Sequence, residues 1–138
     1  MKKKELMNAL LSKDRATAMQ MEHKEIKSKK LSKLTGEDFD IEIRELTPRE
    51  ISNIQALGTD SEGNIIPEKA LDTAIRTCVQ GVIFPDLKDK EIQNQYGCSN
   101  ANDLCEVLFG MEVVNVSAEI MELSTYEIED AVEEIKNE

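Results

Sequence analysis

From residue 47 onward, the apolar residues of this chain recur every three or four positions, which is the spacing of amphipathic α-helices. A clear stripe runs from Ala70 to Val82. Residues 111–123 are apolar on more than one side, as in a helix that neighbours surround. One line of that segment holds Val113, Val116 and Ile120, and a second holds Val114, Ala118 and Met121. This pattern predicts a mainly α-helical, compact domain with residues 111–123 as its central helix.

Start and stop signals divide this region into separate helices. Thr47, Pro48 and Glu50 combine an N-cap, a proline at the first helical position and the acid of a capping box, so a helix is expected to begin here and to end at Gly58. After it, residues 59–66 are expected to form a polar loop facing solvent. The next helix is expected to end near Gly81, because Pro85 cannot continue it.

Residues 84–110 contain two shorter helical patterns between clear breaks. The first runs from Leu87 and stops at Gly97, where a left-handed residue is needed. The second is capped by Asn100 and closed by Gly110. Two helices joined by so few residues fold back on each other, so this block is expected to form a corner against which the longer helices pack.

The one alternating stretch lies earlier, in residues 39–44, where Phe39, Ile41 and Ile43 are separated by charged residues. Strict alternation with β-branched residues is typical of a half-buried strand. A basic run over residues 25–31 lies on the other side of the Thr35-Gly36 turn, and pairing of the two runs would match opposite charges. The sequence therefore predicts one β-hairpin at about residues 25–45.

The two ends of the chain carry amphipathic segments. Leu6, Leu10 and Leu11 form one face of a short helix at the start, followed by polar residues 12–22 that are expected to be a mobile linker. Ser124 to Glu127 repeat the capping-box spacing before a terminal helix with the apolar face Ile128, Val132 and Ile135. These six apolar residues are the candidate partner-binding residues, although either stripe could dock on its own domain. The expected organisation is an N-terminal helix and flexible basic arm in 1–22, a hairpin in 23–46 and a helical domain in 47–138.

Charge is unevenly distributed along the chain. The net charge of −11 combines +6 in residues 1–34 with −17 in the remainder. An acidic body is repelled by phosphate backbones, so direct nucleic-acid binding is not expected. No segment is long and apolar enough for a membrane span, and three cysteines without CxxC spacing fit reduced, buried residues in the cytoplasm.

The sequence offers no catalytic, metal or cofactor site. The single histidine, His23, has no second imidazole or cysteine at ligand spacing and is expected to be a solvated linker residue. Asp86, Asp89 and Glu91 lie among lysines and are explained more simply as a solvated helix face than as an acid–base pair. Residues 60–64, DSEGN, lack the remaining ligands of a calcium loop, so a plain turn is expected.

The order of segments resembles the XkdN-like tail assembly chaperones of phages and defective prophages of Gram-positive bacteria. The likeness covers nearly the whole chain. It rests on the MNALL helix, the FDIEIRELTPREI strand-to-helix junction, the PDLKDKEIQNQYG block, the leucine-rich segment ending in Phe109-Gly110 and the closing VEEIKN.

The resemblance implies a non-enzymatic chaperone of the host cell cytoplasm that is absent from the mature virion. Its implied partners are the tape measure protein, which it would bind and keep soluble, and the tail tube protein, which it would help to recruit. Self-association into a homo-oligomer is left open. The alternative from a different class is an acidic protein that mimics DNA and acts as an inhibitor or regulator, since a carboxylate-rich surface can imitate a phosphate backbone.

Overall fold

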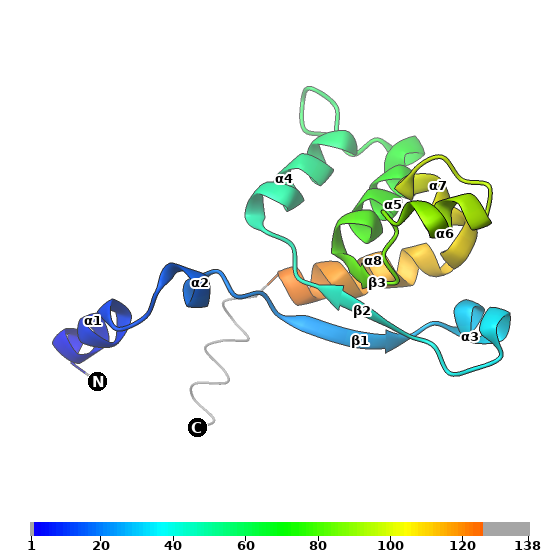
Figure 1. The fold of residues 1–138 in the computed structure, drawn as a ribbon. Helices are drawn as coiled ribbons and strands as arrows, with labels where there is room; N and C mark the ends of the chain where they lie inside the picture. The colour runs from blue at the N-terminus through cyan, green and yellow to red at the C-terminus, as the bar shows by residue number, and fades with distance from the viewer. Residues whose placement is uncertain (1, 126–138) are drawn as a thin grey trace.

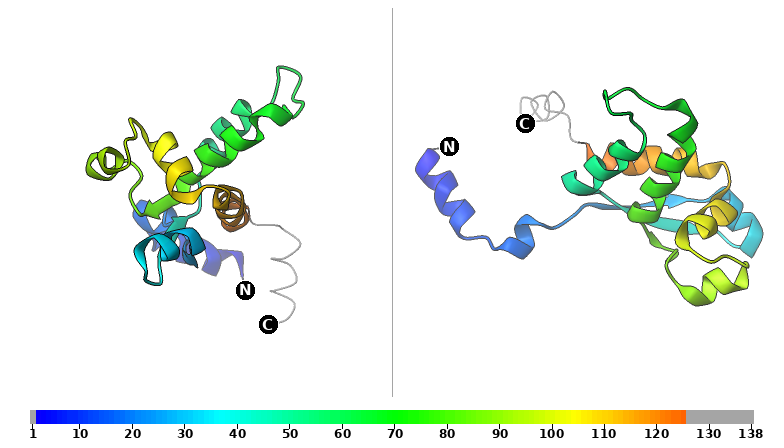
Figure 2. Two further views of the ribbon diagram at one scale, coloured as in Figure 1. Left: turned by 90° about the vertical axis from the view of Figure 1, so that its right-hand side faces the viewer. Right: turned by 90° about the horizontal axis from the view of Figure 1, so that it is seen from above.

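The computed structural model describes residues 2–125 of the chain. Helices α5 (Ala70–Gly81), α7 (Ala101–Phe109) and α8 (Glu112–Ser124) form a layer over one face of a small sheet (Figure 1). Helix α4 (Pro48–Leu57) packs against α5. Residues 2–22 extend away from this body as an arm, which is clear in Figure 1 and in the right view of Figure 2. The mainly α-helical class predicted from the sequence is confirmed.

The sheet is antiparallel with the order β1-β2-β3, formed by His23–Lys27, Asp40–Arg44 and Val82–Phe84. The predicted pairing of the first two strands is confirmed, with His23 opposite Arg44 and Lys27 opposite Asp40. Ile41 and Ile43 of the central strand are fully buried under the helices. Opposite charges face each other only in part, because Glu25 lies opposite Glu42. The third strand was not predicted.

The connection between β1 and β2 is a helix, α3 (Lys29–Thr35), so the expectation that residues 25–31 form one strand is wrong beyond Lys27. Ser28 caps this helix by accepting a hydrogen bond from Leu31 N, and Gly36 ends it at a φ of +78°. Glu112 holds the helix start from outside: its carboxylate accepts hydrogen bonds from Ser28 Oγ at 2.6 Å and Lys29 N at 2.9 Å. A positive φ favours glycine, which explains the Thr35-Gly36 stop.

Helix α4 (Pro48–Leu57) begins with the predicted capping box, in which Thr47 and Glu50 each accept the other's backbone N–H. The same Glu50 carboxylate pairs with Arg44 of β2 through two contacts of 3.0 and 2.8 Å. Hydrogen bonding to Arg44 and to Thr47 lowers the pKa of Glu50 from 4.5 to about 2. One carboxylate therefore joins the sheet to the start of α4.

This arrangement predicts a pH-dependent stability. Because the Glu50 pKa is lower in the folded chain than its ordinary value, its contribution is present above pH 4.5 and is lost as the pH falls towards 2. Glu50→Gln is expected to lower the free energy of unfolding by about 1–2 kcal/mol at pH 7, allowing for solvent screening. Urea unfolding from pH 7 to 3.5 should show the difference in unfolding free energy between Glu50→Gln and wild type narrowing. The control Glu106→Gln changes an exposed side chain and should differ from wild type by no more than about 0.5 kcal/mol at pH 7. A difference in unfolding free energy between Glu50→Gln and wild type that stays the same at every pH would contradict this role of the Glu50 carboxylate.

A loop and a 3-10 turn, η1 (Pro67–Lys69), lead into α5 (Ala70–Gly81), which ends at Gly81 as predicted. Gly81 is required by close packing, since a Cβ there would lie only 2.7 Å from two carbons of Ile120 on α8. Helix α5 packs mainly on α8 (Glu112–Ser124), and β3 then carries the chain to Pro85.

The corner predicted for residues 84–110 consists of α6 (Lys90–Gln95) and α7 (Ala101–Phe109). Helix α6 starts three residues later than Leu87 because Asp89 caps it, while Leu87 is buried and its carbonyl accepts a hydrogen bond from Gln93 Nε2. Asn100 caps α7 by accepting a hydrogen bond from Asp103 N, as expected. Gly97 and Gly110 both have positive φ.

The core is mostly aliphatic and lies between the sheet and helices α5, α7 and α8. Val113, Val116 and Ile120 of α8 are buried in it, so this line of the predicted central helix is confirmed. The second line is only partly surrounded by neighbours: Val114 is 48% exposed and Ala118 is exposed, whereas Met121 is partly buried against the core. Cys78, Cys98 and Cys105 are buried free thiols, and the neighbouring Cys105 together with burial raises the pKa of Cys78.

The arm contains the expected helix α1 (Lys3–Leu11) and a one-turn helix, α2 (Arg15–Ala18). Helix α2 lies within residues 12–22, for which the sequence predicts a mobile linker. Asp14 caps α2 by accepting a hydrogen bond from Thr17 N at 2.8 Å, a signal that the sequence carried. His23 is not a linker residue, because it begins β1 and its Nδ1 lies 3.4 Å from Glu42 Oε1. It remains partly exposed, as expected.

Candidate partner-binding surfaces

A groove of about 1070 Å³ runs between α4, the following loop, α5 and the outer side of α8. Its apolar lining consists of Ile54, Ala56, Ile65, Ile66, Ala70, Leu71, Ala74, Met111, Val114, Ala118 and Met121. Small polar or glycine residues complete it: Ser52, Gln55, Gly58, Thr59, Thr73, Thr77 and Ser117.

The groove is uncharged in a protein of which one third of the residues are charged. Several lining side chains are well exposed, including Met111 at 81%, Ile65 at 79% and Val114 at 48%. Solvent-exposed apolar side chains gathered in one hollow are typical of binding sites for other apolar surfaces. The groove is therefore the strongest candidate site in the described part of the chain.

Local sequence signals explain how the elements around the groove are placed. Gly58 ends α4 where a Cβ would lie 2.8 Å from Thr73 Cγ2, so glycine allows the end of α4 to approach α5 closely. Asp60 then forms a tight turn, since its Oδ1 accepts hydrogen bonds from both Glu62 N and Asn64 N at 2.9 Å. The turn pairs Thr59 with Ile65, which places Ile65 at the edge of the groove. The DSEGN segment thus forms a turn, as expected.

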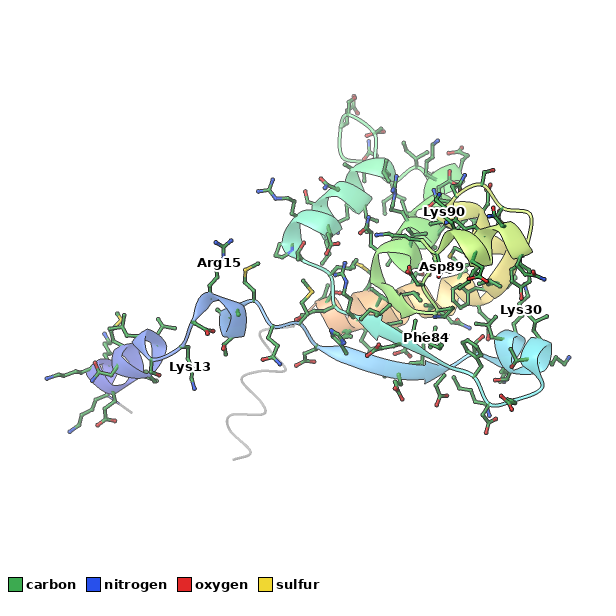
Figure 3. All side chains as sticks on the ribbon, viewed as in Figure 1. Lys13, Arg15, Lys30, Phe84, Asp89 and Lys90 are labelled. Atoms are coloured by element: carbon green, nitrogen blue, oxygen red, sulfur yellow. The ribbon has the colours of Figure 1, made fainter. Side chains whose placement is uncertain are left out.

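A second exposed apolar surface lies on the arm. Leu6, Met7, Leu10 and Leu11 of α1 are 53–75% exposed, and within the described part of the chain none of the α1 residues is buried. Figure 3 shows Lys13 and Arg15 on the same arm, away from the helical body. Of the predicted partner-binding residues, Leu6, Leu10 and Leu11 therefore share one exposed helix. Ile128, Val132 and Ile135 lie outside the described residues.

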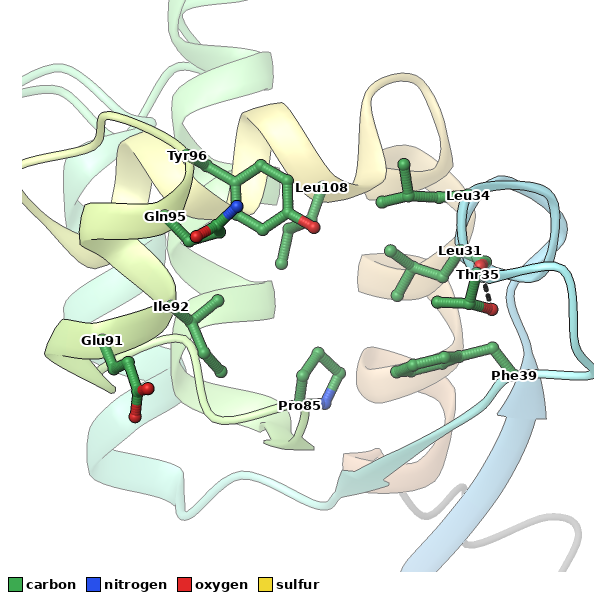
Figure 4. Close-up of a pocket in the computed structure, with 10 residues that line it drawn as sticks. All are labelled: Leu31, Leu34, Thr35, Phe39, Pro85, Glu91, Ile92, Gln95, Tyr96 and Leu108. Atoms are coloured by element: carbon green, nitrogen blue, oxygen red, sulfur yellow. Dashed lines mark hydrogen bonds between the residues drawn. The ribbon is translucent and has the colours of Figure 1, made fainter.

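A smaller cleft of about 380 Å³ separates α3 from α6 (Figure 4). Leu31, Phe39, Pro85, Ile92 and Leu108 form its apolar part, and Glu91, Gln95 and Tyr96 line its α6 side. Phe39 stacks on Phe84 with ring centroids 5.6 Å apart. The cleft is smaller than the groove and has a charged residue, Glu91, in its lining, so it suits a single side chain better than a helix.

The remaining candidate residues have structural roles. Asp89 Oδ1 accepts hydrogen bonds from Glu91 N and Ile92 N, and Asp86 Oδ1 accepts one from Lys88 N, so both carboxylates stabilise turns. Within residues 2–125, no group of three His, Cys, Asp or Glu side chains is arranged to hold a metal ion. Among the same residues, no helix combines the length and apolar character needed to cross a membrane.

Sequence reasoning missed the groove. The sequence predicts that neighbours surround the line of Val114, Ala118 and Met121, and that Ile65 lies in a solvent-facing loop. The available signal was the combination of two apolar lines on residues 111–123 with an isolated Ile65-Ile66 pair in a polar loop. Only the relative positions of α4, α5 and α8 show that these residues meet.

Comparisons with known proteins identify relatives of this arrangement. The family model described as phage XkdN-like tail assembly chaperone protein matches residues 7–136, almost the whole chain. A crystal structure of the protein YqbN is similar in fold, with a TM-score of 0.55 at 16% identity, covering 83% of this chain and 98% of that chain. A comparison with curated proteins gave no significant match.

Proposed function

The chain belongs to the XkdN-like phage tail assembly chaperone family, and we propose that it acts by holding an apolar helical segment of the tape measure protein in the groove. The family is non-enzymatic. A chaperone of this kind needs a surface that covers apolar side chains of a client without reacting with them. The observation that carries the proposal is the large uncharged groove between α4, α5 and α8.

The shape and chemistry of the groove support a helix as its ligand. Residues 111–121, which comprise the N-cap Met111 and most of α8, provide one wall of about 15 Å, the length of a ten-residue helical segment. An amphipathic helix binds such a groove through side chains spaced three or four positions apart. A tape measure protein is long, helical and prone to aggregate, so covering its apolar stripe would keep it soluble.

Two further elements belong to this proposal. Leu6, Leu10, Leu11, Ile128, Val132 and Ile135 are proposed as additional partner-contacting residues. We also propose that the complex helps to bring tail tube subunits to the tape measure protein in the host cell cytoplasm. Binding of tube protein to the preformed complex, compared with the chaperone alone, tests this step.

The groove predicts the effect of one substitution. Val114→Asp places a charge on the groove wall and is expected to weaken capture of the tape measure protein at least tenfold, because the carboxylate must be desolvated against apolar side chains. Val107→Asp is the matched control, since Val107 on α7 is 46% exposed, almost as much as Val114, but lies outside the groove. The measurement is co-expression with the tape measure protein followed by pull-down.

Salt concentration separates this proposal from a DNA-mimic function. Pull-down at about 1 M salt reduces the screening length to ~3 Å, which weakens binding through carboxylates but not through apolar contacts. Retention of the tape measure protein by wild type and by Val107→Asp, with loss from Val114→Asp, supports the groove. Equal retention by all three places the client elsewhere. Retention by none, together with capture of a DNA-binding protein at low salt, excludes the chaperone mechanism.

A further inference from the structure

The exposed helix α1 and the groove are complementary surfaces of the same molecule. Helix α1 has four exposed apolar residues on neighbouring positions of one side, Leu6, Met7, Leu10 and Leu11. Its nine residues span about 14 Å, close to the ~15 Å of α8 that lines the groove. In this structure α1 projects away from the body, so both surfaces face solvent (Figure 2).

Their charges are complementary as well. Residues 2–13 carry four lysines and one glutamate around the apolar stripe of α1. The two segments that line the groove, residues 48–74 and 111–122, carry eight acidic residues and two basic ones, all outside the uncharged lining. A basic helix with an apolar stripe is therefore complementary to the groove. Its apolar side chains match the lining, and its lysines match the acidic residues around the lining.

We propose that the groove is occupied, when no client is bound, by α1 from a second copy of this chain. The inference rests on the proposed client site, because it gives the same groove a competing occupant. The contact is heterologous: one copy contributes the helix and the other the groove, so association continues head to tail unless two copies exchange helices. Four apolar side chains form a small interface, so the association is weak and concentration-dependent.

This arrangement has a consequence for chaperone action. A client helix and α1 compete for one groove, so the apolar surfaces of free chaperone are covered by other copies until the tape measure protein displaces them. Displacement also leaves each α1 free beside the next copy. Neighbouring copies on a client therefore have filled grooves and free arms, and they do not bind one another through this contact.

The first test measures the molar mass of purified full-length protein by light scattering and sedimentation over about 1 μM to 1 mM, without client. Wild type is expected to show a mass that rises with concentration. Leu10→Asp on α1 and Val114→Asp in the groove should each weaken association at least tenfold. Asn8→Asp adds the same charge on the other side of α1, and Val107→Asp adds it outside the groove, so both controls should associate like wild type.

The second test mixes the two defective variants. Leu10→Asp keeps an intact groove and Val114→Asp keeps an intact α1, so the mixture is expected to form a one-to-one heterodimer although neither variant associates alone. A mixture that stays monomeric, a Leu10→Asp protein that associates like wild type, or a wild type that is monomeric at 1 mM would each overturn the proposal. If wild type is monomeric and Val114→Asp increases hydrogen exchange at the α1 amides, the occupant of the groove is the arm of the same chain, which also overturns the proposal.

Client binding is measured separately, so the two proposals fail independently. Adding a helical segment of the tape measure protein to wild type is expected to lower the self-associated mass, because the client and α1 compete for the same groove. A self-associated mass that stays unchanged at saturating client would overturn the competition. Normal client capture by Val114→Asp, with self-association lost, would leave the present inference standing and refute the groove as client site.

Discussion

Replacing Ile120 with Asp is expected to abolish cooperative folding of the helical body. Ile120 is fully buried on α8, and its side chain fills the space left by Gly81 on α5, where a Cβ would lie 2.7 Å away. The substitution removes apolar packing worth about 2–5 kcal/mol and places an unpaired carboxylate among aliphatic side chains. The sum is comparable to the whole stability of a small domain, about 5–15 kcal/mol.

The matched control lies on the same helix. Val114→Asp introduces the same charge at a position that is 48% exposed, so its free energy of unfolding should change by no more than about 1 kcal/mol. Thermal unfolding followed by far-UV circular dichroism distinguishes the two proteins. A soluble Ile120→Asp variant that melts cooperatively within a few degrees of wild type would show that α8 does not pack on α5 through this residue.

Local signals in the sequence predicted the helix boundaries well. The capping box at Thr47 and the cap at Asn100 are found as expected, because each depends on hydrogen bonds between residues three positions apart. The stop at Gly81 is also found as expected, and its signal was Pro85, four positions later. The missed helix α3 also had local signals: Ser28 as N-cap, Leu31 and Leu34 three positions apart, and Gly36 as stop. The lysine-rich composition of residues 27–33 obscured them.

Contacts between distant segments account for what the sequence did not show. Strand β3 has only three residues, too few for a periodic pattern, and it exists because Val82 and Phe84 pair with Ile43 and Glu42 of β2. The groove depends on the separation of α4 from α8, which no residue pattern records. The exposed apolar face of Leu6, Leu10 and Leu11 could be predicted from the sequence, because a helix this short has no core of its own.

Glu112 illustrates how one side chain joins segments that the sequence keeps far apart. It opens α8, yet its carboxylate accepts hydrogen bonds from Ser28 Oγ, Lys29 N and Lys30 N at the start of α3. Ser28 is almost completely buried, so its hydroxyl has little access to water as a replacement. A carboxylate at the first turn of a helix also stabilises the unpaired N–H groups there.

Glu112→Ala is therefore expected to lower the free energy of unfolding by about 2–4 kcal/mol, because hydrogen bonds to a charged group contribute about 1.5–3 kcal/mol each and two of these are short. Glu112→Gln, which keeps an acceptor oxygen but not the charge, should lose less. Glu122→Ala removes an exposed carboxylate from the same helix and should change the free energy by no more than about 0.5 kcal/mol. Urea unfolding at pH 7 gives the three values.

Hydrogen exchange identifies where the lost stability lies. If Glu112 holds α3 in place, Glu112→Ala should increase exchange most at the amides of Leu31 to Thr35 and much less in α5, which Glu112 does not hold by a hydrogen bond within the described residues. A uniform increase across all helices would assign the effect to the start of α8 instead. Glu112→Ala with the stability of the Glu122→Ala control and unchanged α3 exchange would contradict the role of this carboxylate in joining α8 to α3.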